Sequence, residues 1–177
     1  THRRRATSAA SVAGELLLTV GAVLLLFVIY EVFWTDLAAG RLQDEAAAGL
    51  DERWSAAPGS AGTEPLPPPV PPLGEAFARI HLPTLGEDTA YAVVEGTRDV
   101  DLRTGPGHYP DTQMPGDRGN AAFAGHRNGS GAVFERLDRL GPCDAIVVET
   151  QTQWLTYRVL PVGEDESERR SAAQVCL

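Results

Sequence analysis

The longest apolar run of the chain lies near its start and carries no charge. It is the stretch "LLLTVGAVLLLFVIY", residues 16–30. Counted outward to residues 12–34, the run is close to the ~20 residues with which a helix crosses a bilayer. Its end, "YEVFW", supplies the aromatic side chains expected at a membrane interface. The pattern predicts a transmembrane helix over residues 12–34.

The charges around this run predict its orientation. Arg3, Arg4 and Arg5 precede it, so residues 1–11 are expected to form a basic cytoplasmic tail and the rest to lie outside the cell. The alternative is a cleaved signal peptide that ends at the small residues of "LAAG". An aromatic belt has no purpose in a removed peptide, so we favour a single-pass anchor.

Two further segments separate the anchor from the remainder. Over residues 35–55, apolar side chains recur near the helical spacing, which predicts a juxtamembrane helical segment; they are Leu42, Ala46, Leu50 and Trp54. Residues 56–72 include "PLPPPVPP" and break all periodicity. Such a proline-rich linker is an extended, semi-rigid spacer that would hold a folded domain away from the membrane.

Beyond the linker the pattern changes to short alternating strands. Strands are expected in "AFARIHL", "YAVVEG", "AAFAGH", "DAIVVET" and "WLTYRVLPV", the last two forming a hairpin around residues 151–153. One or two helical turns are expected in "AVFERL", residues 132–137. Short strands joined by turn-rich loops predict an all-β fold, a small barrel or sandwich.

Composition then removes several classes of function. A formal net charge of -9, with one basic cluster at the N-terminus, argues against nucleic acid as a partner. The two cysteines form no CxxC motif. The histidines lack the spacing of a metal site, and no GxSxG serine motif occurs, so neither a metal nor a serine nucleophile is expected.

The four histidines differ in their surroundings. His2 belongs to the basic tail and is expected to be solvated, and His81 lies within a predicted strand, where a structural role is expected. His108 lies in the turn-rich "GPGHYP", and its role stays open. His126 ends an apolar strand among glycines, which let backbone approach a substrate closely. Strand ends are fixed yet accessible, which suits a general acid/base, although a structural strand-end histidine fits the residues equally well.

The cysteines are the other candidates for chemistry. Neither Cys143, at a turn, nor Cys176, next to the last residue, has a visible activating neighbour. A disulfide between them is compatible with an extracellular location, but the sequence does not define its geometry.

Several motifs in order resemble those of the class E sortases of actinobacteria. They are the anchor "GELLLTVGAVLLLFVIYEVFWTD" and the later "FARIHLPTLG", "DLRTGPGHYPDTQMPGDRGNAAFAGHR" and "GAVFERLDRL". The resemblance implies an eight-stranded β-barrel and a membrane-anchored cysteine transpeptidase without a cofactor. It implies that the enzyme cleaves sorting-signal peptides of the LPxTG type, LAxTG-like in this class, and joins them to an amine of the cell wall or its precursor. The essential histidine in "AGHR" corresponds to His126, whereas His108 belongs to the upstream "GPGH" motif.

The end of the chain departs from that family pattern. A "TLTTC"-like strand end should carry the nucleophile, but small and polar residues precede Cys176, and Arg169 and Arg170 come before it rather than after. We therefore assign neither a nucleophilic cysteine nor an oxyanion arginine. The expectation is a sortase-like barrel over residues 73–168, incomplete at its C-terminal end. A non-family tail follows over residues 169–177, as in a truncated or frame-disrupted sequence.

Such a chain is expected to lack transpeptidase activity. The alternative function is a catalytically inactive, membrane-tethered β-domain that binds an envelope peptide or protein.

Overall fold

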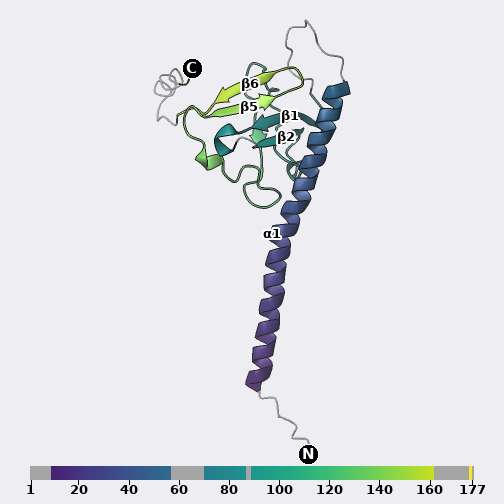
Figure 1. The fold of residues 1–177 in the computed structure, drawn as a ribbon, viewed down its shortest axis with the longest axis vertical. Coiled ribbons are helices and arrows are strands. Elements are labelled where there is room, and N and C mark those ends of the chain that lie inside the picture. Colours follow the sequence, from purple (N-terminus) through teal and green to yellow (C-terminus); the bar gives the residue numbers. More distant parts are fainter. Residues whose placement is uncertain (1–8, 57–69, 87–88, 162–175, 177) are drawn as a thin grey trace, which may run out of the picture. The chain divides into compact units, whose positions relative to one another are not determined.

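The computed structural model describes residues 9–56, 70–86, 89–161 and 176, which fall into two compact units, residues 1–35 and 36–177. All described residues of the first unit belong to helix α1, Ala9–Ala56, which continues into the second unit (Figure 1). The large apolar side chains between residues 16 and 29 are exposed. This helix is long and apolar enough to cross a membrane.

The second unit is built around a six-stranded curled sheet with the order β4-β3-β2-β1-β5-β6 (Figure 1). Its strands are β1 Ala76–His81, β2 Ala90–Glu95, β3 Gly107–His108, β4 Phe123–Ala124, β5 Ala145–Glu149 and β6 Trp154–Arg158. Neighbouring strands are antiparallel except for β2 and β3, which are parallel. In the described part of the chain β4 and β6 are the two edges, so the predicted β fold is confirmed as an open, curled sheet.

The strand predictions succeed where alternation is regular. The β5–β6 hairpin forms as expected, and its turn is closed by the Thr150 amide, which donates to the Gln153 carbonyl at 2.8 Å. Strand β4 is much shorter than the predicted "AAFAGH". Strand β3 and the short helix α2, Asp99–Leu102, lie in stretches for which the sequence predicted neither element.

The prediction of one or two helical turns over residues 132–137 is wrong. The segment forms tight turns that lead into a 3-10 helix, η2, at Leu137–Arg139. Ala132 has a φ of 40°, in the left-handed region that an L-residue rarely adopts and that a right-handed helix excludes. A second 3-10 helix, η1, spans Pro83–Leu85 between β1 and β2.

Apolar side chains cover both faces of the two central strands. On one face β1, β2 and β5 bury a cluster with the turns around them; its buried members are Phe77, Ala78, Ile80, Leu82, Leu85, Val93, Met114 and Val148. On the other face the C-terminal half of α1 packs on β1 and β2, and this cluster consists of Leu50, Ala76, Ala92 and Val94. The buried side chains of β1 and β2 are mostly apolar for this reason, with Glu95 as the buried charged exception.

The half of α1 in the second unit is thus a layer of the domain. Ala46, Leu50 and Trp54 of the predicted stripe contact the sheet, whereas Leu42 is exposed. Beside Leu42, Gln43 makes the polar contact: its amide accepts from the Ala92 amide and donates to the carbonyls of Ala92, at 3.2 Å, and Thr104, at 2.7 Å. The Gln43 side chain therefore satisfies the backbone groups of Ala92 in β2, at a position that the pairing with β3 does not reach.

A compact salt bridge organises the connection from β2 to β3. The Asp101 carboxylate is 3% exposed and accepts from the Arg98 amide and from two guanidinium nitrogens, each at 2.7 Å. These hydrogen bonds from Arg98 outweigh burial and lower the pKa of Asp101 below its ordinary value. The Arg98–Asp101 salt bridge thus fixes the first turn of the connection between the parallel strands β2 and β3.

Replacing Gln43 with Ala should destabilise the second unit by roughly 1–3 kcal/mol, because buried backbone groups of β2 and Thr104 lose their partner. Urea unfolding followed by tryptophan fluorescence measures this loss. Glu45→Ala, at an exposed position of the same helix, is the matched control and should change the unfolding midpoint little. Equal effects of the two variants would contradict the role of Gln43.

Replacing Asp101 with Asn should lower stability at neutral pH, and the difference from the wild type should shrink as the pH falls. A carboxylate whose pKa is lower in the folded than in the unfolded state stabilises the fold above its unfolded pKa. That stability is lost as the pH falls through the folded value. Thermal unfolding from neutral pH to below the ordinary aspartate pKa tests this; a difference that does not depend on pH would contradict it.

Candidate functional site

His126 lies two residues beyond the end of β4, where the chain leaves the sheet. The side chain is half-buried, and its Nε2 atom is fully buried without a hydrogen-bond partner among the described residues. A buried polar atom without a partner is costly, and natural proteins retain few of them. His126 therefore has a buried ring nitrogen that no described residue hydrogen-bonds.

The backbone on either side of His126 is held by the segment that follows it. The Phe134 amide donates to the His126 carbonyl at 3.0 Å, which folds residues 127–133 back as a loop. A Cβ at Gly125 would lie 2.5 Å from the Phe134 ring and 2.8 Å from Val133. Gly125 thus admits these two side chains, rather than exposing backbone to a substrate as the sequence suggested.

The loop after His126 has an unusual backbone. Four consecutive residues, Gly129, Ser130, Gly131 and Ala132, have positive φ angles between 40° and 76°. Glycine adopts this region without strain, but Ser130 and Ala132 do so at a cost of about 1–3 kcal/mol each. The Asp36 carboxylate accepts from the Gly131 amide at 3.3 Å, which ties this loop to α1.

His108 is held very differently, because both of its ring nitrogens have partners. Nδ1 lies 2.8 Å from the Glu95 carboxylate, and Nε2 lies 3.0 Å from both the Gln113 carbonyl and the Thr112 hydroxyl. The side chain is 1% exposed. The ring has no free nitrogen, so His108 belongs to the framework of the site and not to its reactive groups.

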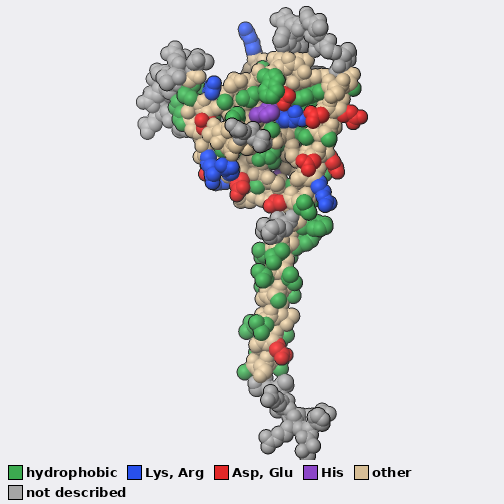
Figure 2. Space-filling model, viewed as in Figure 1, with side chains coloured by type: hydrophobic (Ala, Val, Ile, Leu, Met, Phe, Trp, Pro, Cys, Tyr) green, Lys and Arg blue, Asp and Glu red, His purple; other side chains and the backbone are tan. Residues whose placement is uncertain are grey.

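His81 belongs to a charged cluster on the face of the sheet that α1 covers. Its Nε2 lies 2.9 Å from the Glu149 carboxylate, which also accepts from Arg79 at 3.3 Å, and its ring packs on Trp154. Figure 2 shows histidine, basic and acidic side chains together over β1. Burial would lower the pKa of Arg79, but its contacts with Asp51 and Glu149 outweigh burial and raise it. These contacts make His81 a structural residue, and His2 lies outside the described residues.

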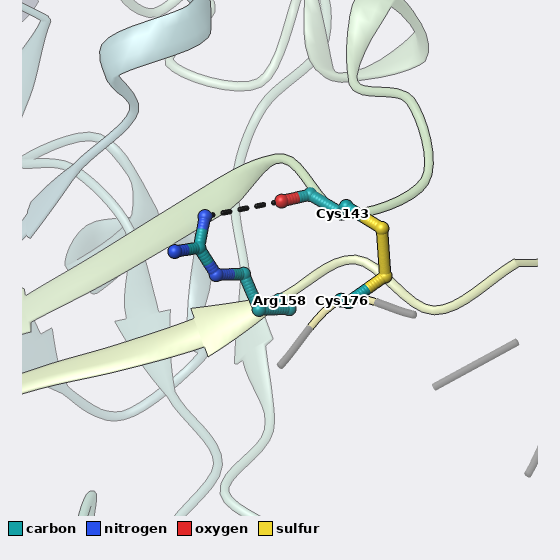
Figure 3. The surroundings of a disulfide bond; sticks show 3 residues. All are labelled: Cys143, Arg158 and Cys176. Atoms are coloured by element: carbon teal, nitrogen blue, oxygen red, sulfur yellow. Dashed lines mark hydrogen bonds between the residues drawn. A yellow bond between two sulfur atoms is a disulfide. The ribbon is translucent and has the colours of Figure 1, made fainter. Parts of the chain in front are cut away.

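The two cysteines of the chain are joined to each other. Cys143 and Cys176 form a disulfide (Figure 3), which ties the turn before β5 to the described residue near the end of the sequence. The same turn is fixed to β6, since the Arg158 guanidinium donates to the Cys143 carbonyl at 3.2 Å and the Cys143 amide to Val159 at 2.9 Å. With both sulfurs bonded, this form of the chain has no thiol that could act as a nucleophile.

The sequence assigns no nucleophilic cysteine and no oxyanion arginine as a partner of His126, and the described residues bring no free thiol to it. Arg169 and Arg170, considered and set aside from the sequence, lie outside these residues. The described part of the chain also contains no group of three or more histidine, cysteine, aspartate or glutamate side chains arranged to hold a metal ion. A pocket of about 130 Å³ is lined by residues 131–133, 135 and 136 together with η1 and β2, and its volume is below the few hundred Å³ typical of ligand sites.

Comparison with known proteins identifies the family of this chain. A family model described as a sortase domain matches residues 80–175, a range that includes most of the tail set apart in the sequence analysis. Sortase SrtE1 of Streptomyces coelicolor is 37% identical over 175 residues, covering 90% of this chain and 47% of the relative. Sortase SrtE2 of the same organism is 36% identical over 180 residues, covering 93% of this chain and 67% of the relative.

A solved structure agrees with these relatives. The SrtF sortase from Corynebacterium diphtheriae is 54% identical over the matched part, with a TM-score of 0.57. That match covers 64% of this chain and 55% of the other, and the chain spans about half the length of SrtE1. The chain belongs to the sortase family of cell-wall sorting transpeptidases, as a member of its class E.

Proposed function

We propose that the protein is a membrane-anchored member of the sortases that cleave an LPxTG-type sorting signal, LAxTG-like in this class, and attach surface proteins to the cell wall, and that residues 1–177 lack the nucleophilic cysteine and the arginine of that reaction. The observation that carries the proposal is the buried, unpartnered Nε2 of His126 at the end of β4, in a chain of the class E family. Its partners would be sorting-signal peptides and an amine of peptidoglycan or its precursor.

His126 is the general acid/base of this reaction. A cysteine thiolate attacks the threonine carbonyl of the signal, and His126 protonates the glycine amine that leaves as the thioester forms. An incoming amine then attacks the thioester, gives its proton to the same histidine, and releases the thiolate. A ring nitrogen without a hydrogen-bond partner among the described residues supports this role, because no bond to the described part of the fold would have to break before either proton transfer.

Helix α1 is the anchor of this enzyme. Its apolar part would span the membrane once, with residues 1–11 in the cytoplasm and the sheet outside the cell, where sorting signals and cell-wall amines are found. Support comes from the length and hydropathy of α1 and from the three arginines that precede it.

Residues 1–177 would bind the signal without cleaving it. Thioester chemistry needs a thiolate, and both cysteines of this sequence are consumed in the Cys143–Cys176 disulfide. The same observation favours a second function for this chain, a tethered β-domain that binds an envelope peptide. Binding without turnover is common to both functions.

The test uses the full chain in detergent micelles, incubated with an LAxTG peptide in the absence and presence of a reductant. We expect neither a cleavage product nor a thioester adduct by mass spectrometry, because no cysteine lies in a family-like nucleophile motif. We also expect the peptide to change the amide NMR signals of residues 123–134, which surround His126. A scrambled peptide is the control and should change none of them.

Two outcomes would contradict this account. A thioester adduct that forms after reduction and is lost in Cys176→Ala, but not in the matched Cys143→Ala, would refute the predicted inactivity. Absence of any peptide-dependent change near His126 would count against both functions.

A further inference from the structure

Glu95 and His108 form a buried pair inside the sheet. They are register partners on the parallel strands β2 and β3, and each is 1% exposed. The Glu95 Oε2 atom lies 2.8 Å from His108 Nδ1, while Glu95 Oε1 has no hydrogen-bond partner among the described residues. The imidazole packs between the rings of Phe77 and Phe123, at centroid distances of 5.8 and 5.4 Å.

The other nitrogen of His108 must carry a hydrogen. Its Nε2 lies 3.0 Å from the Gln113 carbonyl, which can only accept. The Thr112 hydroxyl, also at 3.0 Å, lies 2.8 Å from the Tyr109 carbonyl, to which it donates its single hydrogen. Thr112 therefore accepts from His108 as well, and an Nε2–H is the one arrangement that satisfies both neighbours.

The partner of Nδ1 sets this arrangement. With a hydrogen on Nε2, the contact between Nδ1 and Glu95 holds one shared proton, whichever of the two atoms carries it. Without a partner for Nδ1, the ring would lose the side-chain contact that fixes its orientation in the sheet. The Nε2–H would then no longer be held against the Gln113 carbonyl. Glu95 thus helps to hold the Nε2 atom of His108 against the Gln113 carbonyl.

We propose that Glu95 and His108 are a positioning pair that fixes the loop of residues 109–122 and the start of β4. The loop closes on β4 through the Tyr109 amide, which donates to Ala122 at 2.9 Å, and through the Ala122 amide, which donates to the Thr112 hydroxyl at 3.1 Å. Phe123, the register partner of His108, stands three residues before His126. That the pair serves catalysis rests on the proposed function; that it orders this part of the fold does not.

The first test is the nitrogen NMR spectrum of the imidazole rings in the full chain at neutral pH, in detergent micelles. The proposal predicts that the Nε2 atom of His108 carries a hydrogen. An unprotonated Nε2 would overturn the proposal without any variant having to fold.

The second test compares His108→Asn with Glu95→Gln by amide hydrogen exchange. An Asn side chain can still reach Glu95 but not the Gln113 carbonyl, so exchange in residues 109–122 should accelerate about tenfold, as expected for one lost hydrogen bond. A Gln at position 95 can donate to Nδ1 and preserve the Nε2–H, so exchange there should stay close to that of the wild type. The ring signals of His126 should shift in the first variant only.

The β5–β6 hairpin is the internal control for both variants. Acceleration of similar size in the hairpin and in residues 109–122 would mean that the pair only stabilises the whole domain, and would overturn the proposal. The proposal would also be overturned if amide exchange in residues 109–122 were unchanged in His108→Asn. The same holds if exchange there were as fast in Glu95→Gln as in His108→Asn. If His108→Asn does not fold, Glu95→Ala replaces it and should accelerate the loop where Glu95→Gln does not. None of these readouts needs a peptide or its cleavage, so they are independent of the test of function.

Discussion

Burial of β1 and β2 on both faces is the constraint on which the rest of this domain depends. One face packs on the cluster around Phe77, Ile80 and Val93, and the other packs on Leu50 and its neighbours in α1. A fully buried aliphatic side chain contributes about 1.5–3 kcal/mol, so neither cluster could be left open to water without a large loss. The half of α1 beyond residue 35 is therefore a structural layer of the domain, joined to it also by Gln43 and Asp51.

The candidate site depends on the same central strands. Strand β2 carries Glu95 and pairs with β3, which carries His108. Strand β3 in turn pairs with β4, and His126 lies two residues beyond the end of β4. The β1–β2 ladder has five residue pairs, whereas β2–β3 and β3–β4 have two each, and turn hydrogen bonds and buried polar contacts replace the ladder there. Backbone strain gathers where the ladder ends, at residues 129–132, as it often does at functional sites. At this edge one ring nitrogen of His126 is buried without a hydrogen-bond partner among the described residues.

The sequence predicts what local pattern can encode. The apolar run of residues 16–30 indicates a helix long and apolar enough to cross a membrane, and the two apolar strands on either side of residues 151–153 predict the β5–β6 hairpin. The "AGHR" motif singles out His126 as a candidate. It does not predict contacts made across the fold. Nothing local marks Gln43 as the partner of Ala92, or pairs Glu95 with His108, because strand register brings these groups together. Ala132 is a further case, since its left-handed backbone is imposed by the turn and opposes its own helical propensity.

The most direct test of the account is whether the second unit needs its α1 layer. Residues 36–177 and residues 73–177, the latter starting where the sequence alone places the β-domain, can be compared by amide NMR under identical conditions. The account predicts a dispersed, cooperative spectrum for residues 36–177. It predicts collapse or aggregation for residues 73–177, because the face formed by Ala76, Ala92 and Val94 is then uncovered. A dispersed spectrum of equal stability from residues 73–177 would contradict it.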